Sequence, residues 1–145
     1  MKFMNKLMGA VLGGAMVLGA IALPTTAVAR DAAVTPKVVI QVSDSDPAYW
    51  NLALNNTKNV QKDLKDAVIE IVAYGPGIGM LKADSVVTSR ISEMADSGIK
   101  IVACQNTMRG QKLTKDDMNS SIGYVPSGVV EIMDRQMDGY AYIRP

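Results

Sequence analysis

The sequence predicts an α/β fold built on a parallel or mostly parallel five-stranded sheet. Short runs rich in valine and isoleucine alternate along the chain with segments whose apolar residues recur three and four positions apart. Near-continuous β-branched runs are typical of parallel strands that are covered on both faces. Alternating strands and helices joined by right-handed crossovers place helices on both sides of such a sheet. We therefore expect one domain with helices above and below its sheet.

The first 29 residues show the three regions of a secretory signal peptide. Lys2 and Lys6 make a basic start, residues 7–23 are apolar, and Ala27-Val28-Ala29 is a small-x-small cleavage site. This pattern favours export to the periplasm with cleavage after Ala29. Once the segment is removed, no membrane attachment is expected. An uncleaved membrane anchor is the alternative, although about 17 apolar residues are at the lower limit for a spanning helix.

The domain is expected over residues 37–145, after a linker at 30–36 that carries no periodic pattern. Residues 37–43 predict the first strand. Asp46 followed by Pro47 predicts a helix start. An aspartate cap can accept hydrogen bonds from the unpaired N–H groups of the first turn, and proline's missing N–H costs no hydrogen bond at that position. The helix is expected over residues 47–64. Its inward stripe is Trp50, Ala53, Leu54, Thr57, Val60 and Leu64.

The middle of the chain repeats this alternation. Residues 67–73 predict a second buried strand, and residues 74–79, with three glycines and a proline, predict its loop. A helix is expected from Asp84 or Ser85 to Gly98. Its inward residues are Val87, Ile91, Met94 and Ala95. The next apolar run, which ends at Cys104, predicts the third strand.

The last third of the chain supplies the remaining elements. Thr114 is expected to cap a short helix at residues 114–118, and Ser127 a helix from residue 128 to 137 or 138. Gly139 is expected to end that helix. The fourth and fifth strands are expected at residues 122–125 and 140–144.

Composition excludes several classes of function. The chain has 15 basic and 14 acidic residues with no basic cluster, so a nucleic-acid partner is not expected. The absence of histidine removes the Ser-His-Asp and Cys-His arrangements and the commonest metal ligand. We expect no hydrolase, no metal site and no bound cofactor. The lone cysteine has no intramolecular disulfide partner.

Cys104 is the strongest candidate for chemistry, because it ends a buried strand and a turn into helix-like backbone follows it. Ligands gather at the carboxyl ends of strands in α/β sheets. Backbone N–H groups and the charge of Arg109 would stabilise a thiolate there. Asn106 and Thr107 would donate hydrogen bonds to an anionic sulfur species. The alternatives are a buried, inert thiol and ordinary capping of the next helix.

The glycine-rich loop is the second candidate, through Gly75, Gly77 and Gly79. It matches a dinucleotide-binding turn poorly, since Met80 stands where the last glycine is required and the loop follows the second strand. Loops at the carboxyl ends of neighbouring parallel strands lie together. We therefore expect these glycines to form a wall of a pocket beside Cys104, and the alternative is a turn without a ligand.

A lone thiolate without histidine is suited to sulfur exchange: attack on a sulfane sulfur, formation of a persulfide, and transfer to another thiol. Two other classes remain open. One is a non-enzymatic, oligomeric module that binds a small ligand or a protein and keeps a structural cysteine. The other is a thiol redox sensor that dimerises through Cys104.

Three motifs of the chain resemble the DsrE/DsrF-like family, and most closely its small, single-domain YchN-like branch. They are residues 103–108, residues 74–78, and residues 125–136 together with 139–145. The resemblance implies a three-layer α/β/α sandwich and assembly into trimers or hexamers. It further implies a sulfurtransferase-like carrier whose Cys104 holds sulfur as a persulfide in a relay with donor and acceptor proteins. The family's relay proteins are cytoplasmic, so the export signal leaves the identity of those partners open.

Overall fold

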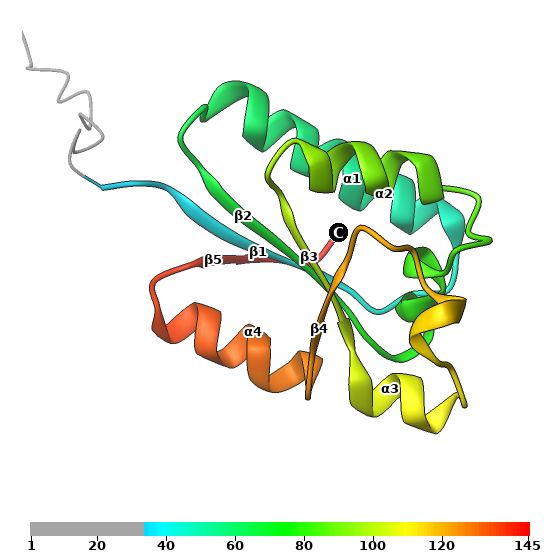
Figure 1. The fold of residues 1–145 in the computed structure, drawn as a ribbon. Coiled ribbons are helices and arrows are strands. Elements are labelled where there is room, and N and C mark those ends of the chain that lie inside the picture. Colours follow the sequence, from blue (N-terminus) through cyan, green and yellow to red (C-terminus); the bar gives the residue numbers. More distant parts are fainter. Residues whose placement is uncertain (1–33) are drawn as a thin grey trace, which may run out of the picture. The chain divides into compact units, whose positions relative to one another are not determined.

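The computed structural model describes residues 34–145, so the predicted signal peptide and most of the predicted linker lie outside the described residues. Five strands form one sheet in the order β4-β3-β2-β1-β5, and every neighbouring pair is parallel (Figure 1). This confirms the predicted α/β class. The strands are β1 (Lys37–Val42), β2 (Val68–Ala73), β3 (Lys100–Cys104), β4 (Gly123–Val125) and β5 (Ala141–Ile143).

Helices cover both faces of the sheet. The α-helices are α1 (Pro47–Asp63), α2 (Thr88–Asp96), α3 (Gln105–Gly110) and α4 (Gly128–Met137), and the 3₁₀ helices are η1 (Gly75–Leu81) and η2 (Lys115–Asp117). Helices α1 and α2 lie on one face and α4 on the other (Figure 1). From β1 to β4 the chain steps across the sheet in one direction, whereas the step from β4 to β5 returns across it. Right-handed crossovers therefore place α4 on the opposite face.

Helix α1 follows its sequence signals. The Ala48 N–H donates to Asp46 Oδ1 at 2.8 Å, and Pro47 occupies the first turn. The buried residues include most of the predicted stripe, which confirms the periodicity argument. They are Trp50, Ala53, Leu54 and Thr57.

Replacing this cap should weaken the fold measurably. Asp46→Ala is expected to lower the free energy of unfolding by about 1 kcal/mol, because it leaves the first-turn N–H groups of α1 without their acceptor. Urea denaturation measures the change. Asp63→Ala, which removes a carboxylate at the other end of α1, is the control and should stay within about 0.5 kcal/mol of the unmodified protein. Equal losses in the two variants would contradict the capping role.

Two predicted elements differ from the structure. Helix α2 begins at Thr88 rather than at Asp84 or Ser85. The preceding segment is instead held by long-range bonds, since the Ala83 N–H donates to the Asp117 carbonyl at 2.9 Å and Lys82 bridges to Met118. The loop predicted at residues 74–79 is largely the 3₁₀ helix η1, most of which is buried.

The predicted Ser127 cap is also wrong. Ser127 precedes α4, but its side chain makes no capping hydrogen bond. The first turn of α4 lies instead against Cys104 and Tyr74. Thr114 does precede a short helix, and the Asp117 carboxylate accepts a hydrogen bond from its N–H at 2.7 Å.

The two faces of the sheet carry cores of unequal size. The core under α1 and α2 contains most of the buried apolar residues, including Leu54, Met80 and Ile91. The core under α4 is small and consists of Val39, Val72, Val102, Val125 and Ile132. Helix α4 therefore adds one large buried apolar side chain to its core, Ile132. Within residues 34–145 no helix is both long enough and apolar enough to cross a membrane.

Candidate functional site

Cys104 lies where the connections of two neighbouring strands diverge. It is the last residue of β3 and pairs in register with Val125 at the end of β4. The connection after β3 runs to the α2 face, where Met118 bridges to Lys82. The connection after β4 forms α4 on the opposite face. A divergence of this kind at the carboxyl edge of a parallel sheet is the usual place for a ligand site in α/β proteins.

The sulfur of Cys104 lies between the first turns of two helices. Cys104 is the N-cap residue of α3, and its Sγ accepts a hydrogen bond from the Thr107 N–H at 3.5 Å. Helix α4 starts close by. A Cβ atom at Gly128 would lie 3.3 Å from the Cys104 Cβ and 3.0 Å from the Tyr74 Cβ. The glycine thus allows the backbone of α4 to approach the thiol, and Cys104 is only 4% exposed.

The surroundings of the thiol favour its ionised form. Burial acts to raise the pKa of Cys104, but hydrogen bonds from the Thr107 hydroxyl and from the N–H groups of Gly128, Thr107 and Asn106 together outweigh it. The pKa of the thiol therefore lies below its ordinary value. The Asn106 N–H is shared, because it also donates to the Pro126 carbonyl at 3.2 Å. Such donors are typical of reactive rather than inert cysteines.

Thr107 connects this thiol to the glycine-rich segment. Its Oγ1 accepts a hydrogen bond from the Gly75 N–H at 2.9 Å, and the Gly75 carbonyl accepts one from Gln111 Nε2 at 3.2 Å. Gly75 has φ +54°, a conformation that glycine adopts without strain. Of the three predicted glycines, Gly75 is the one linked to the Cys104 environment.

Gly77 and Gly79 lie against β1 and α1. A Cβ at Gly77 would lie 2.4 Å from the Val42 carbonyl oxygen at the end of β1, and one at Gly79 would lie 3.2 Å from the Trp50 ring. These two glycines permit close packing of η1 against β1 and α1. The contacts found for Gly77 and Gly79 are thus with β1 and α1, and their predicted place in a pocket wall beside Cys104 stays a prediction.

Asn106 and Arg109 lie on the exposed surface of α3. The Arg109 guanidinium donates to the Asn106 side-chain oxygen, so these side chains pair with each other. Neither side chain makes a hydrogen bond to Cys104 Sγ. What Asn106 contributes to the thiol is its backbone N–H.

Sequence reasoning missed two parts of this region. The sequence predicts Gly128 only as the first residue of a helix, although Pro126-Ser127-Gly128 directly follows the strand that neighbours Cys104. Glu70 lies within a predicted buried strand, where a carboxylate indicates a buried ion pair. In the described part of the chain, no group of three or more histidine, cysteine, aspartate or glutamate residues is arranged to hold a metal ion.

Removing the Thr107 hydroxyl should make the thiol less acidic. Thr107→Val keeps the shape of the side chain but deletes a donor to Cys104, so the pKa of the thiol is expected to rise by about 0.5–1 unit. The ultraviolet absorbance of the thiolate, followed against pH with Cys104→Ser as the blank, gives this value. Thr107→Ser retains the hydroxyl and should stay near the original midpoint. A midpoint in Thr107→Val that matches the unmodified protein would argue against this donor.

Comparison with known proteins gives one family and several solved structures. The model of the DsrE/DsrF-like family matches residues 37–145. The chain is similar to MTH1491 from Methanobacterium thermoautotrophicum, a protein of unknown function, with 36% identity, a TM-score of 0.74, and coverage of 76% of this chain and 99% of that one. No curated protein matches.

Two further structures share the fold alone. BT1422 from Bacteroides thetaiotaomicron, also of unknown function, is 20% identical with a TM-score of 0.63, and the match covers 75% of this chain and 94% of that one. The ychN protein from E. coli is 6% identical with a TM-score of 0.63, and the match covers 77% and 100%.

Proposed function

Because the chain belongs to the DsrE/DsrF-like family, we propose that it is an exported, sulfurtransferase-like carrier that binds sulfane sulfur as a persulfide on Cys104. The observation that carries the proposal is the hydrogen-bonded position of the thiol between two helix N-termini. A thiolate is the nucleophilic form of cysteine, and these donors favour it over the thiol.

The proposed chemistry is two thiol exchange steps. The Cys104 thiolate attacks the outer sulfur of a polysulfide or thiosulfate, a new S–S bond forms, and the S–S bond of the donor breaks. The shortened polysulfide or the sulfite leaves with the electron pair, and the thiol proton has already passed to water. An acceptor thiolate then attacks the outer sulfur of the persulfide and releases the Cys104 thiolate. No external oxidant or reductant is required.

Access to the sulfur requires local movement, since Cys104 is only 4% exposed. The groups nearest to it include the Gly128 backbone and the Tyr74 side chain, which approach each other closely. A displacement of the start of α4 would open a path for a small sulfur donor while the sheet stays intact.

Intact-mass measurement tests the proposal. After incubation with polysulfide, the protein is expected to gain the mass of one or more sulfur atoms, and dithiothreitol should remove it. Cys104→Ser, shown to be folded by circular dichroism, should gain nothing. A folded, unmodified protein that acquires no Cys104-dependent sulfur would overturn the proposal.

The burial of Cys104 favours a second candidate, a binding module with a structural cysteine. In that case the thiol serves as the N-cap of α3 and a small hydrophobic side chain. Alkylation of the native thiol would then be no faster than global unfolding allows. Fast native alkylation together with persulfide formation would exclude this candidate.

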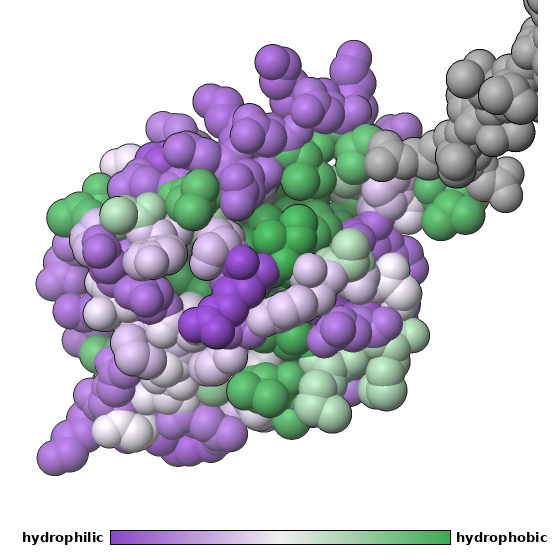
Figure 2. Space-filling view, turned by 180° about the vertical axis from the view of Figure 1, so that it is seen from behind, coloured by the Kyte–Doolittle hydropathy of each residue, from purple (hydrophilic) through white to green (hydrophobic). Residues whose placement is uncertain are grey.

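The proposal includes a periplasmic location and a homo-oligomer, a trimer or hexamer. Exposed large apolar side chains support assembly with further copies of the chain, and four of them lie on α4: Val129, Val130, Met133 and Met137, which are 51–77% exposed. Figure 2 shows a face on which apolar residues are exposed among hydrophilic ones. Apolar surface of this kind commonly marks an interface. Light scattering on the exported protein gives the number of copies, and a monomer would exclude the assembly.

A further inference from the structure

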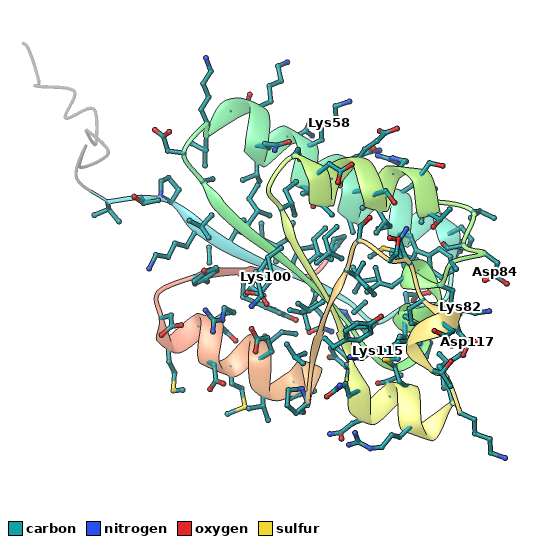
Figure 3. The ribbon with its side chains drawn as sticks, in the orientation of Figure 1. Lys58, Lys82, Asp84, Lys100, Lys115 and Asp117 are labelled. Atoms are coloured by element: carbon teal, nitrogen blue, oxygen red, sulfur yellow. The ribbon has the colours of Figure 1, made fainter. Side chains whose placement is uncertain are left out.

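A group of buried and half-buried charges joins α4 to the sheet. Glu70 of β2 is 1% exposed, and its Oε1 lies 3.0 Å from the Nζ of Lys100 on β3. The same Nζ lies 3.0 Å from Oε1 of Glu131 on α4. Arg135 Nε, one helical turn further, lies 3.3 Å from Glu131 and 3.7 Å from Glu70. In Figure 3, Lys100 is labelled beside the sheet face that α4 covers. We call these four residues the α4 charge cluster.

Apolar packing alone does little to fix the position of α4. Of its residues only Gly128 and Ile132 are buried, and the other large apolar side chains of the helix are exposed to solvent. A surface helix normally turns its apolar face inward. In α4 the inward side therefore depends on the ion pairs of Glu131 and Arg135 as well as on Ile132.

The cluster lies close to the end of α4 that contacts the thiol. Gly128 and Glu131 are three residues apart, so they share one side of the helix, separated by about 4.5 Å along its axis. The backbone of Gly128 packs against Cys104, since a Cβ there would lie 3.3 Å from the Cys104 Cβ. The Gly128 N–H also helps to lower the pKa of the thiol, so a shift of the first turn would weaken that effect.

We propose that the α4 charge cluster positions the first turn of α4, so that the backbone of Gly128 is held against Cys104. Glu70, Lys100, Glu131 and Arg135 are thus positioning residues for the thiolate. The inference deepens the proposed function, because this thiolate is the one that would accept sulfur.

Glu70 faces charged side chains from both elements that approach it. Lys100 approaches from β3, and Glu131 and Arg135 approach from α4. Arg135 is itself held by Asp138 at 3.1 Å, and its guanidinium lies over the Tyr140 ring. Burial and the adjacent Glu131 carboxyl raise the pKa of Glu70, against the effect of Lys100. Contacts with Glu70 and Lys100, together with the positive charge of Arg135, outweigh burial and lower the pKa of Glu131. The two carboxyl groups therefore differ in acidity and share the two cations.

The direction in which the pKa of the Cys104 thiol changes in one variant tests this inference. Glu131→Gln removes a negative charge, and through the electric field alone that change would make the thiol of Cys104 more acidic. Loss of positioning predicts the opposite. We expect the midpoint of thiolate absorbance, measured against pH with Cys104→Ser as the blank, to rise by about 0.5–1 unit, which is a three- to tenfold smaller thiolate fraction near neutral pH.

Asp134→Asn is the matched control, because it removes a carboxylate from α4 that forms no ion pair within residues 34–145. Its midpoint should stay unchanged or fall slightly. Arg135→Lys keeps the charge but loses the planar guanidinium, and it should also raise the midpoint. This second variant keeps the test decisive if Glu131→Gln does not fold.

A midpoint in Glu131→Gln that falls or matches the Asp134→Asn control would overturn the positioning role, as would an unchanged midpoint in Arg135→Lys. The measurement uses no sulfur donor. If the midpoints shift as expected but no persulfide forms, the proposed function is rejected and the positioning role stands. If a persulfide forms but the midpoints do not shift, the positioning role is rejected and the proposed function stands.

Discussion

Gly77→Ala is expected to lower the free energy of unfolding by about 3 kcal/mol or more. The added Cβ would lie 2.4 Å from the Val42 carbonyl oxygen, 2.6 Å from its carbon and 2.8 Å from the Ser43 Cα. All three are backbone atoms at the end of a strand in the middle of the sheet, and rotation of a side chain cannot relieve the contact. Either η1 or β1 must shift, and both contribute side chains to the core under α1 and α2.

Urea denaturation of Gly77→Ala measures the loss, and Gly110→Ala is the matched control. A Cβ at Gly110 meets nothing within 4 Å, and this glycine ends helix α3. That variant should therefore be neutral or slightly more stable, because alanine loses less conformational entropy than glycine in a helix. If both variants unfold at the same urea concentration, η1 does not pack on β1 as described.

Lys100→Met is expected to destabilise the protein by about 2 kcal/mol at pH 8, and by less as the pH falls. The substitution leaves the buried carboxylate of Glu70 without its closest cation. Losing one partner of a buried pair costs about 3–5 kcal/mol, and we expect less here because Lys100 is half-exposed and Arg135 remains.

The pH dependence follows from the direction of the Glu70 shift. The pKa of this carboxyl is already raised in the folded protein by burial and by Glu131, and removing Lys100 raises it further. Between the ordinary carboxyl pKa and the raised one, the folded variant holds a proton that the unfolded chain releases. Its stability therefore falls as the pH rises through that window.

Denaturation at several pH values between 5 and 8 checks this dependence. Lys58→Met replaces an exposed lysine of α1 that forms no ion pair in the described part of the chain, and it should stay within about 0.5 kcal/mol of the unmodified protein at each pH. A loss in Lys100→Met that is independent of pH would show that Lys100 does not affect the ionisation of Glu70 in the folded protein.

The strands were predictable because each carries a local signal. The runs that form β1, β2 and β3 are nearly continuous valine and isoleucine, and their parallel pairing follows from the helices between them. The helix signals at Asp46 and Gly98 were equally local. The start of α2 was predicted too early, because contacts with a segment more than thirty residues later hold Lys82 and Ala83 outside the helix.

The site was predictable in part. The position of Cys104 at a strand end followed from the apolar run before it. The roles of Asn106 and Arg109 did not, because α3 turns both side chains to the surface. The three glycines form one sequence group but have two structural roles, which depend on contacts with Thr107 in one case and with β1 and α1 in the other, all distant along the chain. The ion pairs of Glu70 depend on which helix crosses β2, which no local pattern encodes.

The unequal cores on the two faces of the sheet imply an order of local unfolding. Stability is distributed unevenly in a protein, and layers with few buried apolar side chains open at lower free energy. Among the described residues, the thin layer beneath α4 contains five buried apolar residues. Its detachment would uncover Cys104 without disturbing the hydrophobic interior under α1 and α2. We therefore expect a cysteine that is sealed in the average conformation to reach solvent through the opening of this layer.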